Sequence, residues 1–196
     1  MAKLLRVNMT TRNCTYEELP RELNRTGGRG LTSGVVAKEV SPICDPLGKD
    51  NKLVIAPGLL SGTACPNSGR MSVGAKSPLT GGIKESNVGG NSASKMARIG
   101  LSAVIIEGQA QGDSIFVLSL KKDSAELVPA NELKGLGTYA LTKTLLEPFS
   151  KKPSIMCIGP AGEMKLLSAS IQVTDPDGHP SRAAGRGGLG AVMGSK

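Results

Sequence analysis

Aromatic residues are scarce in this chain of 196 residues, which has no tryptophan, two tyrosines and two phenylalanines. Proteins that bind single-stranded nucleic acid stack its bases on exposed aromatic side chains, so this scarcity argues against that class. No apolar run approaches the roughly 18 residues that a membrane-spanning helix needs. The start, MAKLLRVNMTTRN, offers only a short apolar patch before Arg6, too little for a secretory signal. We therefore expect a cytoplasmic protein with no membrane or nucleic-acid partner.

Cysteine is also sparse, and the four present, Cys14, Cys44, Cys65 and Cys157, form no C-x-x-C pair. Zinc sites and iron–sulfur clusters draw on closely spaced cysteines, so these four do not make such a site by themselves. In a cytoplasmic protein we expect free, buried thiols. Glycine (26 residues) and proline (12) stay below the share of roughly 25–30% that marks low-complexity chains. The glycines therefore belong to an ordered fold.

Positive charge, in contrast, is in excess: the net charge is +8, which favours an anionic partner. Two glycine-rich stretches, 70–98 and 178–196, hold most of the unbalanced basic residues, with Glu85 the one acidic residue between Arg70 and Arg98. Where glycine removes the Cβ, backbone N–H groups can approach a phosphate closely. These stretches suit a small phosphorylated ligand, and charge alone leaves a solvated basic face as an equal alternative.

Apolar runs and breaker residues predict an α+β chain of about seven short strands and three helices. The strands are expected at 4–9, 51–58, 69–78, 102–108, 114–120, 154–159 and 166–174. The helices are expected at 31–40, 91–100 and 136–149, with turns at 77–82 and 160–163. The strict strand–helix alternation of a doubly wound sheet is missing, so no Rossmann fold follows.

The last stretch, GHPSRAAGRGGLGAVMGSK (178–196), superficially resembles two nucleotide- or RNA-binding motifs. It does not match a P-loop, because Ser195 precedes Lys196 where GK[ST] is required. Its single RGG is followed by apolar residues, including Leu189 and Val192, whereas RNA-binding RGG tails repeat the motif and are disordered. We therefore predict an ordered, ligand-binding loop. His179, between Gly178 and Pro180, is expected to be a solvated loop residue.

Seven blocks in order resemble the N-terminal domain of the aldehyde ferredoxin oxidoreductases, tungsten- or molybdenum-containing enzymes of anaerobes. The blocks are LRVNMTT (5–11), GGRGL (27–31), DPLGKDNKLVIAPGLLSGT (45–63), SGRMSVGAKSPLTGGIKESNVGG (68–90), IIEGQA (105–110), IGPAGE (158–163) and RAAGRGGLGAVMGSK (182–196). They span nearly the whole chain. The resemblance implies two mainly antiparallel sheets related by a pseudo-two-fold axis, with a few helices, forming the base of a bis-pterin site.

The resemblance also implies the residues of that site, none of them catalytic. The cofactor-binding residues would be Arg70, Asn87, Gly89, Arg182, Ala183, Gly185 and Arg186. Asn87 and Ala183 would supply oxygens to a magnesium ion that joins the two pterin phosphates, and Arg70 would lie between one pterin and a 4Fe–4S cluster. The chemistry agrees, since magnesium accepts neutral carbonyl oxygens beside phosphate and arginine forks suit phosphate.

The implied function is the oxidation of aldehydes to carboxylic acids, with ferredoxin or another carrier as electron acceptor and a tungsten (or molybdenum) bis-pyranopterin as cofactor. Members of the family are about three times longer, so residues 1–196 are expected to be one truncated pterin-binding domain. Its partners would be the remaining domains or subunits, which hold the cluster ligands, and a second copy in a homodimer. The alternatives are a paralogue such as an aryl-CoA reductase subunit, or a non-catalytic basic domain that binds RNA or acidic protein.

Overall fold

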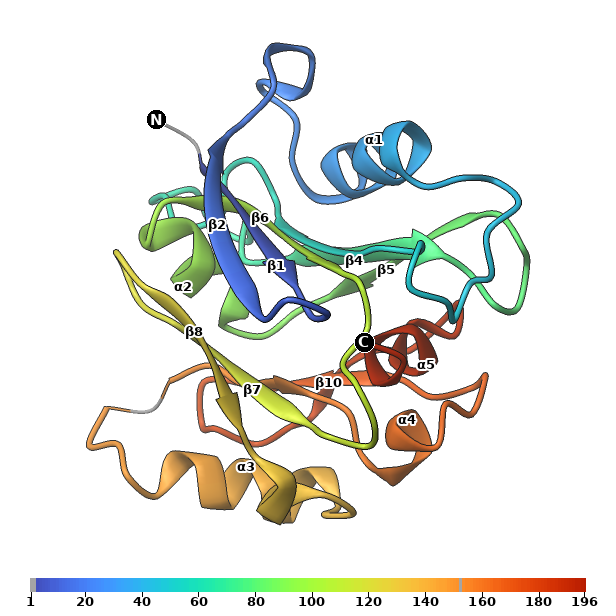
Figure 1. Cartoon of the computed structure of the whole chain (residues 1–196). Coiled ribbons are helices and arrows are strands. Elements are labelled where there is room, and N and C mark those ends of the chain that lie inside the picture. Colours follow the sequence, from blue (N-terminus) through green and yellow to red (C-terminus); the bar gives the residue numbers. More distant parts are fainter. Residues whose placement is uncertain (1–2, 152) are drawn as a thin grey trace.

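The computed structural model describes residues 3–151 and 153–196 and contains a six-stranded sheet built entirely from residues 3–107, called the first half below (Figure 1). Its strands are β1 (Lys3–Asn8), β2 (Asn13–Glu18), β3 (Leu53–Pro57), β4 (Met71–Lys76), β5 (Ile83–Val88) and β6 (Leu101–Glu107). They lie in the order β2-β1-β6-β3-β4-β5. The β1–β6 pair is parallel and the other pairs are antiparallel.

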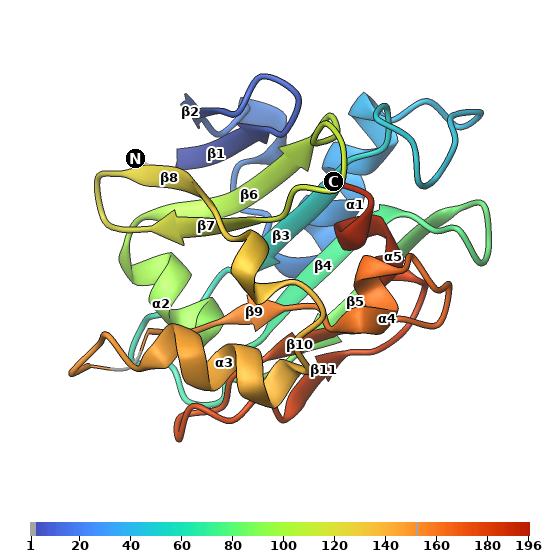
Figure 2. The same cartoon turned by 60° about the horizontal axis from the view of Figure 1, so that its bottom comes forward.

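The second half forms two smaller antiparallel sheets (Figure 2). One pairs β7 (Phe116–Leu120) with β8 (Ala125–Pro129), and the other has the order β11-β10-β9. Its strands are β9 (Met156–Cys157), β10 (Ile171–Val173) and β11 (Arg182–Ala184). The helices are α1 (Gly28–Glu39), α2 (Ser92–Arg98), α3 (Thr138–Leu146), α4 (Pro160–Glu163) and α5 (Leu189–Gly194), with single 3-10 turns η1 (Arg21–Leu23) and η2 (Asn131–Leu133).

The main core lies between the six-stranded sheet and the second half of the chain. Leu5, Val73 and Val104 on one side meet Ile171 and Val192 on the other, and all are buried. Alternate residues of the same strands face the opposite way, where α1 covers them, whereas α3 covers the outer side of the second half (Figure 1). The apolar run of β3 is therefore buried on both faces, as continuous apolar strands usually are.

The two halves repeat one order of elements. In each, a β-hairpin leads through a 3-10 turn to an α-helix and then to three strands and a further helix: β1-β2-η1-α1-β3-β4-β5-α2 and β7-β8-η2-α3-β9-α4-β10-β11-α5. The one-turn helix α4, between β9 and β10, has no counterpart in the first half. The 3-10 turns have matching hydrogen bonds, with Leu23 N–H donating to Pro20 O and Leu133 N–H to Ala130 O, both at 3.0 Å. Two related sheets were expected, one in each half, whereas the described part of the second half forms two separate sheets.

The predicted fold class, α+β with mainly antiparallel sheets and few helices, is confirmed. Strands 51–58 and 102–108 and all three helices are present within a few residues of the predicted ends. The segment 160–163 is the one-turn helix α4 and not a bare turn, and within 166–174 only 171–173 is strand. Strands β2, β5, β8 and β11 and helix α5 were not predicted. Among the described helices, none has the length and apolar character that crossing a membrane requires.

Candidate cofactor-binding site

A cavity of about 510 Å³ lies where the edge strand β5 of the large sheet approaches the edge strand β11 of the small one. It is lined by Arg70, Asn87, Val88, Gly89, Gly90, Pro176, Ser181, Arg182 and Ala183. Five of the seven expected cofactor-binding residues are in this lining. The lining contains two arginines and no carboxylate, so the cavity is suited to an anionic ligand.

Two serine hydroxyls of the large sheet and its turn hold the segment that follows β11 beside this cavity. The N–H of Arg186 donates to the Ser86 hydroxyl at 3.4 Å, and the Ser77 hydroxyl donates to the carbonyl of Gly187 at 2.8 Å. A Cβ on Gly187 would lie only 2.3 Å from the Lys84 side chain, so this approach requires glycine. Gly185 and Arg186 thus lie in the segment that joins the sheets and do not line the cavity.

Arg70 and Asn87 form the centre of the site. The Arg70 Nε–H donates to the Asn87 side-chain oxygen, while the Asn87 amide nitrogen donates to the Met71 carbonyl at 3.1 Å. These contacts fix which way the Asn87 amide points, and they orient the guanidinium of Arg70. A Cβ on Gly89 would be 3.6 Å from the Arg70 guanidinium, so glycine there leaves the arginine face open.

A second cavity of about 620 Å³ shares Arg70 and Asn87 with the first. Gly28 and Arg29, at the N-terminus of α1, line it together with Gly58. The N-cap of α1, Gly27, has no side chain that could cap the helix, so the free N–H groups of the first turn are available to an anion. Sequence reasoning used GGRGL only as part of a resemblance and did not assign these residues to the site.

Glu85 is the acidic residue of the second cavity. Its carboxylate accepts a hydrogen bond from the Ser72 hydroxyl at 2.6 Å and one from Arg29 Nε–H at 3.1 Å. The Glu85 side chain is 9% exposed, whereas that of Arg29 is 76% exposed. Both carboxylate oxygens are therefore engaged, and Glu85 is not a free acid–base group. Its role could not be read from the sequence, because only the pairing of β4 with β5 places it beside Ser72.

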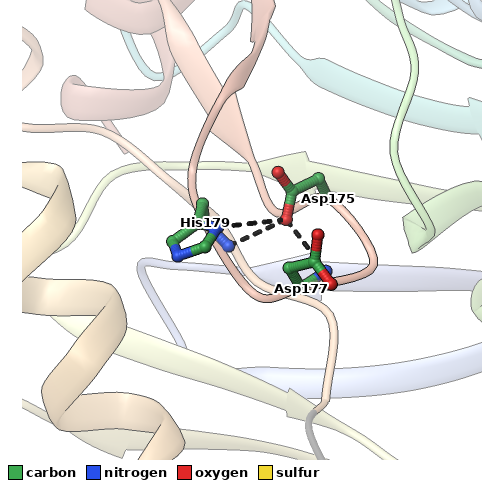
Figure 3. Close-up of side chains that lie close together, drawn as sticks. All are labelled: Asp175, Asp177 and His179. Atoms are coloured by element: carbon green, nitrogen blue, oxygen red, sulfur yellow. Dashed lines mark hydrogen bonds and ion pairs between the residues drawn. The ribbon is translucent and has the colours of Figure 1, made fainter.

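Asp175, Asp177 and His179 lie close together in the loop between β10 and β11 (Figure 3). The Asp175 carboxylate accepts backbone N–H groups of Asp177 at 3.0 Å and His179 at 2.9 Å, and the Ser181 hydroxyl at 2.7 Å. The Ser181 hydroxyl and these backbone groups lower the pKa of Asp175. The carboxylate thus shapes the loop that leads into Arg182. His179 is exposed, as expected.

All four cysteines are free thiols, as predicted, although only Cys157 is fully buried and Cys65 is exposed in the lining of the second cavity. Burial raises the pKa of Cys157 to about 11. Within the described part of the chain, no group of three potential metal ligands includes a cysteine.

A family model and several known proteins match almost the whole chain. Residues 4–196 match the family model "Aldehyde ferredoxin oxidoreductase, N-terminal domain". The chain is 41% identical to the tungsten-containing aldehyde ferredoxin oxidoreductases of Pyrococcus furiosus and of Thermococcus kodakarensis, in each case over 99% of the chain and 31% of the relative. It is 32% identical to an aliphatic sulfonate oxidoreductase, WOR-like subunit, of Pyrococcus furiosus, over 99% of the chain and 32% of that protein.

A solved structure has the same fold. The active-site complex BamBC of benzoyl coenzyme A reductase, in complex with 1,5-dienoyl-CoA, superposes with a TM-score of 0.91 at 28% identity. The match covers all of this chain and 29% of that one. The chain thus spans about a third of the length of the relatives that it resembles.

Proposed function

Since the chain belongs to the aldehyde ferredoxin oxidoreductase N-terminal domain family, we propose that it is the pterin-binding domain of an enzyme that oxidises aldehydes to carboxylic acids. The complete enzyme would extend beyond these residues and pass electrons through a 4Fe–4S cluster, held by its other parts, to ferredoxin. We place this enzyme in the cytoplasm of an anaerobe, with a homodimer as its expected assembly.

The observation that carries the proposal is the symmetry of the cavity. Asn87 and Ala183 hold equivalent positions in the two halves: Asn87 precedes Val88, which pairs with Met71, and Ala183 precedes Ala184, which pairs with Ile171. Both residues line the cavity between β5 and β11. A site that takes one edge strand from each half suits a ligand with two like halves, and a tungsten (or molybdenum) bis-pyranopterin is such a ligand.

The residues present also fit a magnesium ion between two phosphates. Asn87 offers a neutral oxygen from its side chain, which also accepts the Arg70 Nε–H, or from its backbone carbonyl. Ala183 offers a backbone carbonyl, and no carboxylate lines the cavity. Magnesium keeps near-octahedral oxygen coordination and pairs readily with phosphate oxygens, which would balance its charge without an acidic side chain. We therefore assign Asn87 and Ala183 to the ion.

The remaining site residues would bind the cofactor and orient it. When bound, the bis-pyranopterin supplies the two-electron redox chemistry of aldehyde oxidation. Arg70, held by Asn87, presents a fixed cation to the ligand, and Arg182 provides a second fork for phosphate. Gly89 keeps side chains out of the space over Arg70. Gly185 and Arg186 support the site by joining β11 to β5. No residue of this chain is proposed to transfer a proton to the substrate.

A reductase acting on an aryl-CoA is the second candidate, because the solved structure that shares the fold belongs to benzoyl coenzyme A reductase. The higher identity to the aldehyde-oxidising relatives favours the first candidate. Assays of the complete enzyme with an aldehyde and with an aryl-CoA distinguish the two.

The proposal is tested on the complete enzyme, purified without oxygen, by measuring tungsten, molybdenum, magnesium and pterin content and viologen-linked aldehyde oxidation. We expect Asn87→Ala to lose magnesium and most of the pterin. Arg70→Ala should retain more pterin than activity, since a fixed cation beside the cofactor tunes its potential. Asn13→Ala, on the exposed part of β2, is the matched control and should match the unaltered enzyme. Full magnesium and pterin in Asn87→Ala would refute the assignment.

A further inference from the structure

Glu85 is a carboxylate in a cavity that otherwise suits an anion. Among the residues that line the second cavity it is the acidic one, while Arg29 and Arg70 carry positive charge. A carboxylate beside an anionic ligand opposes binding by charge repulsion, and burying the carboxylate adds a desolvation cost. The Glu85 side chain is nonetheless largely buried. What its carboxylate contacts shows how it can favour the ligand that its charge opposes.

The pairing of β4 with β5 places Glu85 between two elements. Glu85 lies opposite Gly74, and Asn87 lies opposite Ser72, on the face of the sheet that α1 crosses (Figure 1). Residues two apart in a strand share a face, so Glu85 and Asn87 are neighbours there. Since Gly74 has no side chain, the Glu85 carboxylate can reach Ser72 on β4 and Arg29 at the start of α1.

The hydrogen bonds that end on Glu85 all run in one direction. The Ser72 hydroxyl has a single proton, which it donates to Glu85 at 2.6 Å. The Ser72 oxygen can therefore only accept from Asn87, whose amide nitrogen lies 3.4 Å away. The Asn87 side-chain oxygen is left to face Arg70, whose Nε–H donates to it. The carboxylate thus determines which end of the Asn87 amide meets the arginine.

Both arginines of the second cavity are held through the same nitrogen. Arg29 donates its Nε–H to Glu85 at 3.1 Å, and Arg70 donates its Nε–H to Asn87. Because Nε lies at the base of the guanidinium, a bond there restricts rotation of the group and leaves the two terminal nitrogens for a ligand. One carboxylate therefore acts on two arginine forks, directly on Arg29 and through Ser72 and Asn87 on Arg70.

We propose that Glu85 is a positioning residue, which orients the guanidinium groups of Arg29 and Arg70 toward an anionic ligand in the second cavity. Side chains that are already oriented lose less conformational freedom when the ligand binds, and this gain outweighs the repulsion from one carboxylate. The class of the ligand, a phosphorylated pterin, rests on the proposed function. The positioning itself rests on the hydrogen bonds within this chain.

Calorimetry of inorganic pyrophosphate binding to the complete enzyme, produced without its cofactor, tests the proposal. Glu85→Gln removes a negative charge, so electrostatics alone would tighten the binding of this anion. An amide has one acceptor oxygen in place of two, however, and cannot hold both Ser72 and Arg29 as the carboxylate does. We expect the dissociation constant of pyrophosphate to rise about 10-fold, the effect of one lost hydrogen bond to a charged group.

Two further variants separate positioning from charge. Ser72→Ala changes no charge and breaks only the connection to Arg70. We expect the dissociation constant to rise about threefold in this variant, since the Met71 carbonyl still accepts from the Asn87 amide at 3.1 Å. Glu126→Gln removes a carboxylate from the exposed part of β8, outside the lining of both cavities, and should leave the binding unchanged.

Equal or tighter binding of pyrophosphate by Glu85→Gln would overturn the proposal, because charge alone would then describe the residue. Unchanged binding by Ser72→Ala, or no binding by the unaltered enzyme, would overturn it as well. Ser72→Ala also serves as the test where Glu85→Gln fails to fold. The proposed function is judged separately, by the pterin and tungsten content of the unaltered enzyme. An enzyme without pterin whose pyrophosphate binding depends on Glu85 would refute that function and leave the positioning role in place.

Discussion

Gly74 lies in the middle of β4, where helix α1 crosses the sheet. A Cβ at this position would be 2.7 Å from the Cβ of Thr32 and 2.9 Å from its hydroxyl oxygen. Both residues are buried, so neither has room to move. Such overlap in a packed interior costs about 1–3 kcal/mol.

We therefore expect Gly74→Ala to lower the free energy of unfolding by about that amount, measured by urea denaturation. Gly82→Ala is the control, because a Cβ on Gly82 meets no atom within 4 Å. Equal stability of the two variants would show that α1 does not press on β4 as described.

The site residues illustrate what could be predicted from single positions. Arg70, Asn87, Gly89, Arg182 and Ala183 come together in one cavity, although they lie in two segments about a hundred positions apart. Their motifs indicated them through a family resemblance, and no local pattern could have shown that the two segments meet. The position of Glu85 could not be predicted, because it depends on the pairing of β4 with β5, which no local sequence pattern shows.

At the scale of the elements, α1 is held to the large sheet by a network of charges as well as by its apolar face. Arg6 on β1 contacts Glu39 at the end of α1 at 2.9 Å and Glu107 on β6 at 3.1 Å. Lys52 contacts the same two carboxylates at 2.6 and 2.8 Å. Burial alone would raise the pKa of Glu39, but hydrogen bonds from Arg6 and Lys52 outweigh it and lower the pKa below 4.5.

A carboxyl group whose pKa is lower in the folded state stabilises the fold above its unfolded value and loses that effect as the pH falls through the folded value. We expect Glu39→Gln to reduce the free energy of unfolding at neutral pH by about 1 kcal/mol after solvent screening. The difference from the unaltered chain should vanish below the folded pKa of Glu39. Urea titrations across that range measure it.

Glu22→Gln is the control for this prediction. Glu22 pairs with Lys38 at the surface, where both side chains are more than half exposed. The hydrogen bond from Lys38 lowers the pKa of Glu22, but solvent screens the pair, so its removal should change stability much less than removal of Glu39 at every pH. A constant difference between Glu39→Gln and the unaltered chain at all pH values would show that packing, not charge, is responsible.

The elements that sequence analysis missed share a physical cause. Strand β2, with the sequence NCTYEE, has no fully buried residue and is positioned mainly by pairing with β1, so no apolar alternation marks it. Helix α5 has only six residues and two of them are glycines, yet Leu189, Ala191 and Val192 are fully buried. In both cases tertiary packing, which no local pattern encodes, decides the conformation.

For the whole molecule, exposed apolar side chains indicate surfaces that the complete enzyme would cover. Leu59 and Leu60 beside the second cavity are 61% and 55% exposed, and Met164, Leu166 and Leu167 after α4 are also exposed. Clusters of this kind mark interaction surfaces or cause self-association.

We expect the chain ending at Lys196 to self-associate with rising concentration in sedimentation velocity and to show no aldehyde oxidation when supplied with pterin and tungstate. Leu166→Ser combined with Leu167→Ser should reduce the association, and Lys122→Ser, on an exposed turn, should not. Strong binding of random RNA that weakens as salt is raised would instead support a basic binding domain, since phosphate contacts weaken with salt. A monodisperse monomer at all concentrations would contradict the expected interfaces.

The segregation of the large sheet into the first half of the chain also matters while the protein is being made. All six of its strands lie between residues 3 and 107, and α1, which covers its outer face, lies within the same span. The complete sheet therefore emerges from the ribosome before β7 does, and domains form from the N-terminus as they emerge. The newborn sheet presents Leu5, Val73 and Val104 to solvent until the second half arrives, so the order of synthesis makes the first half a template on which the second is assembled.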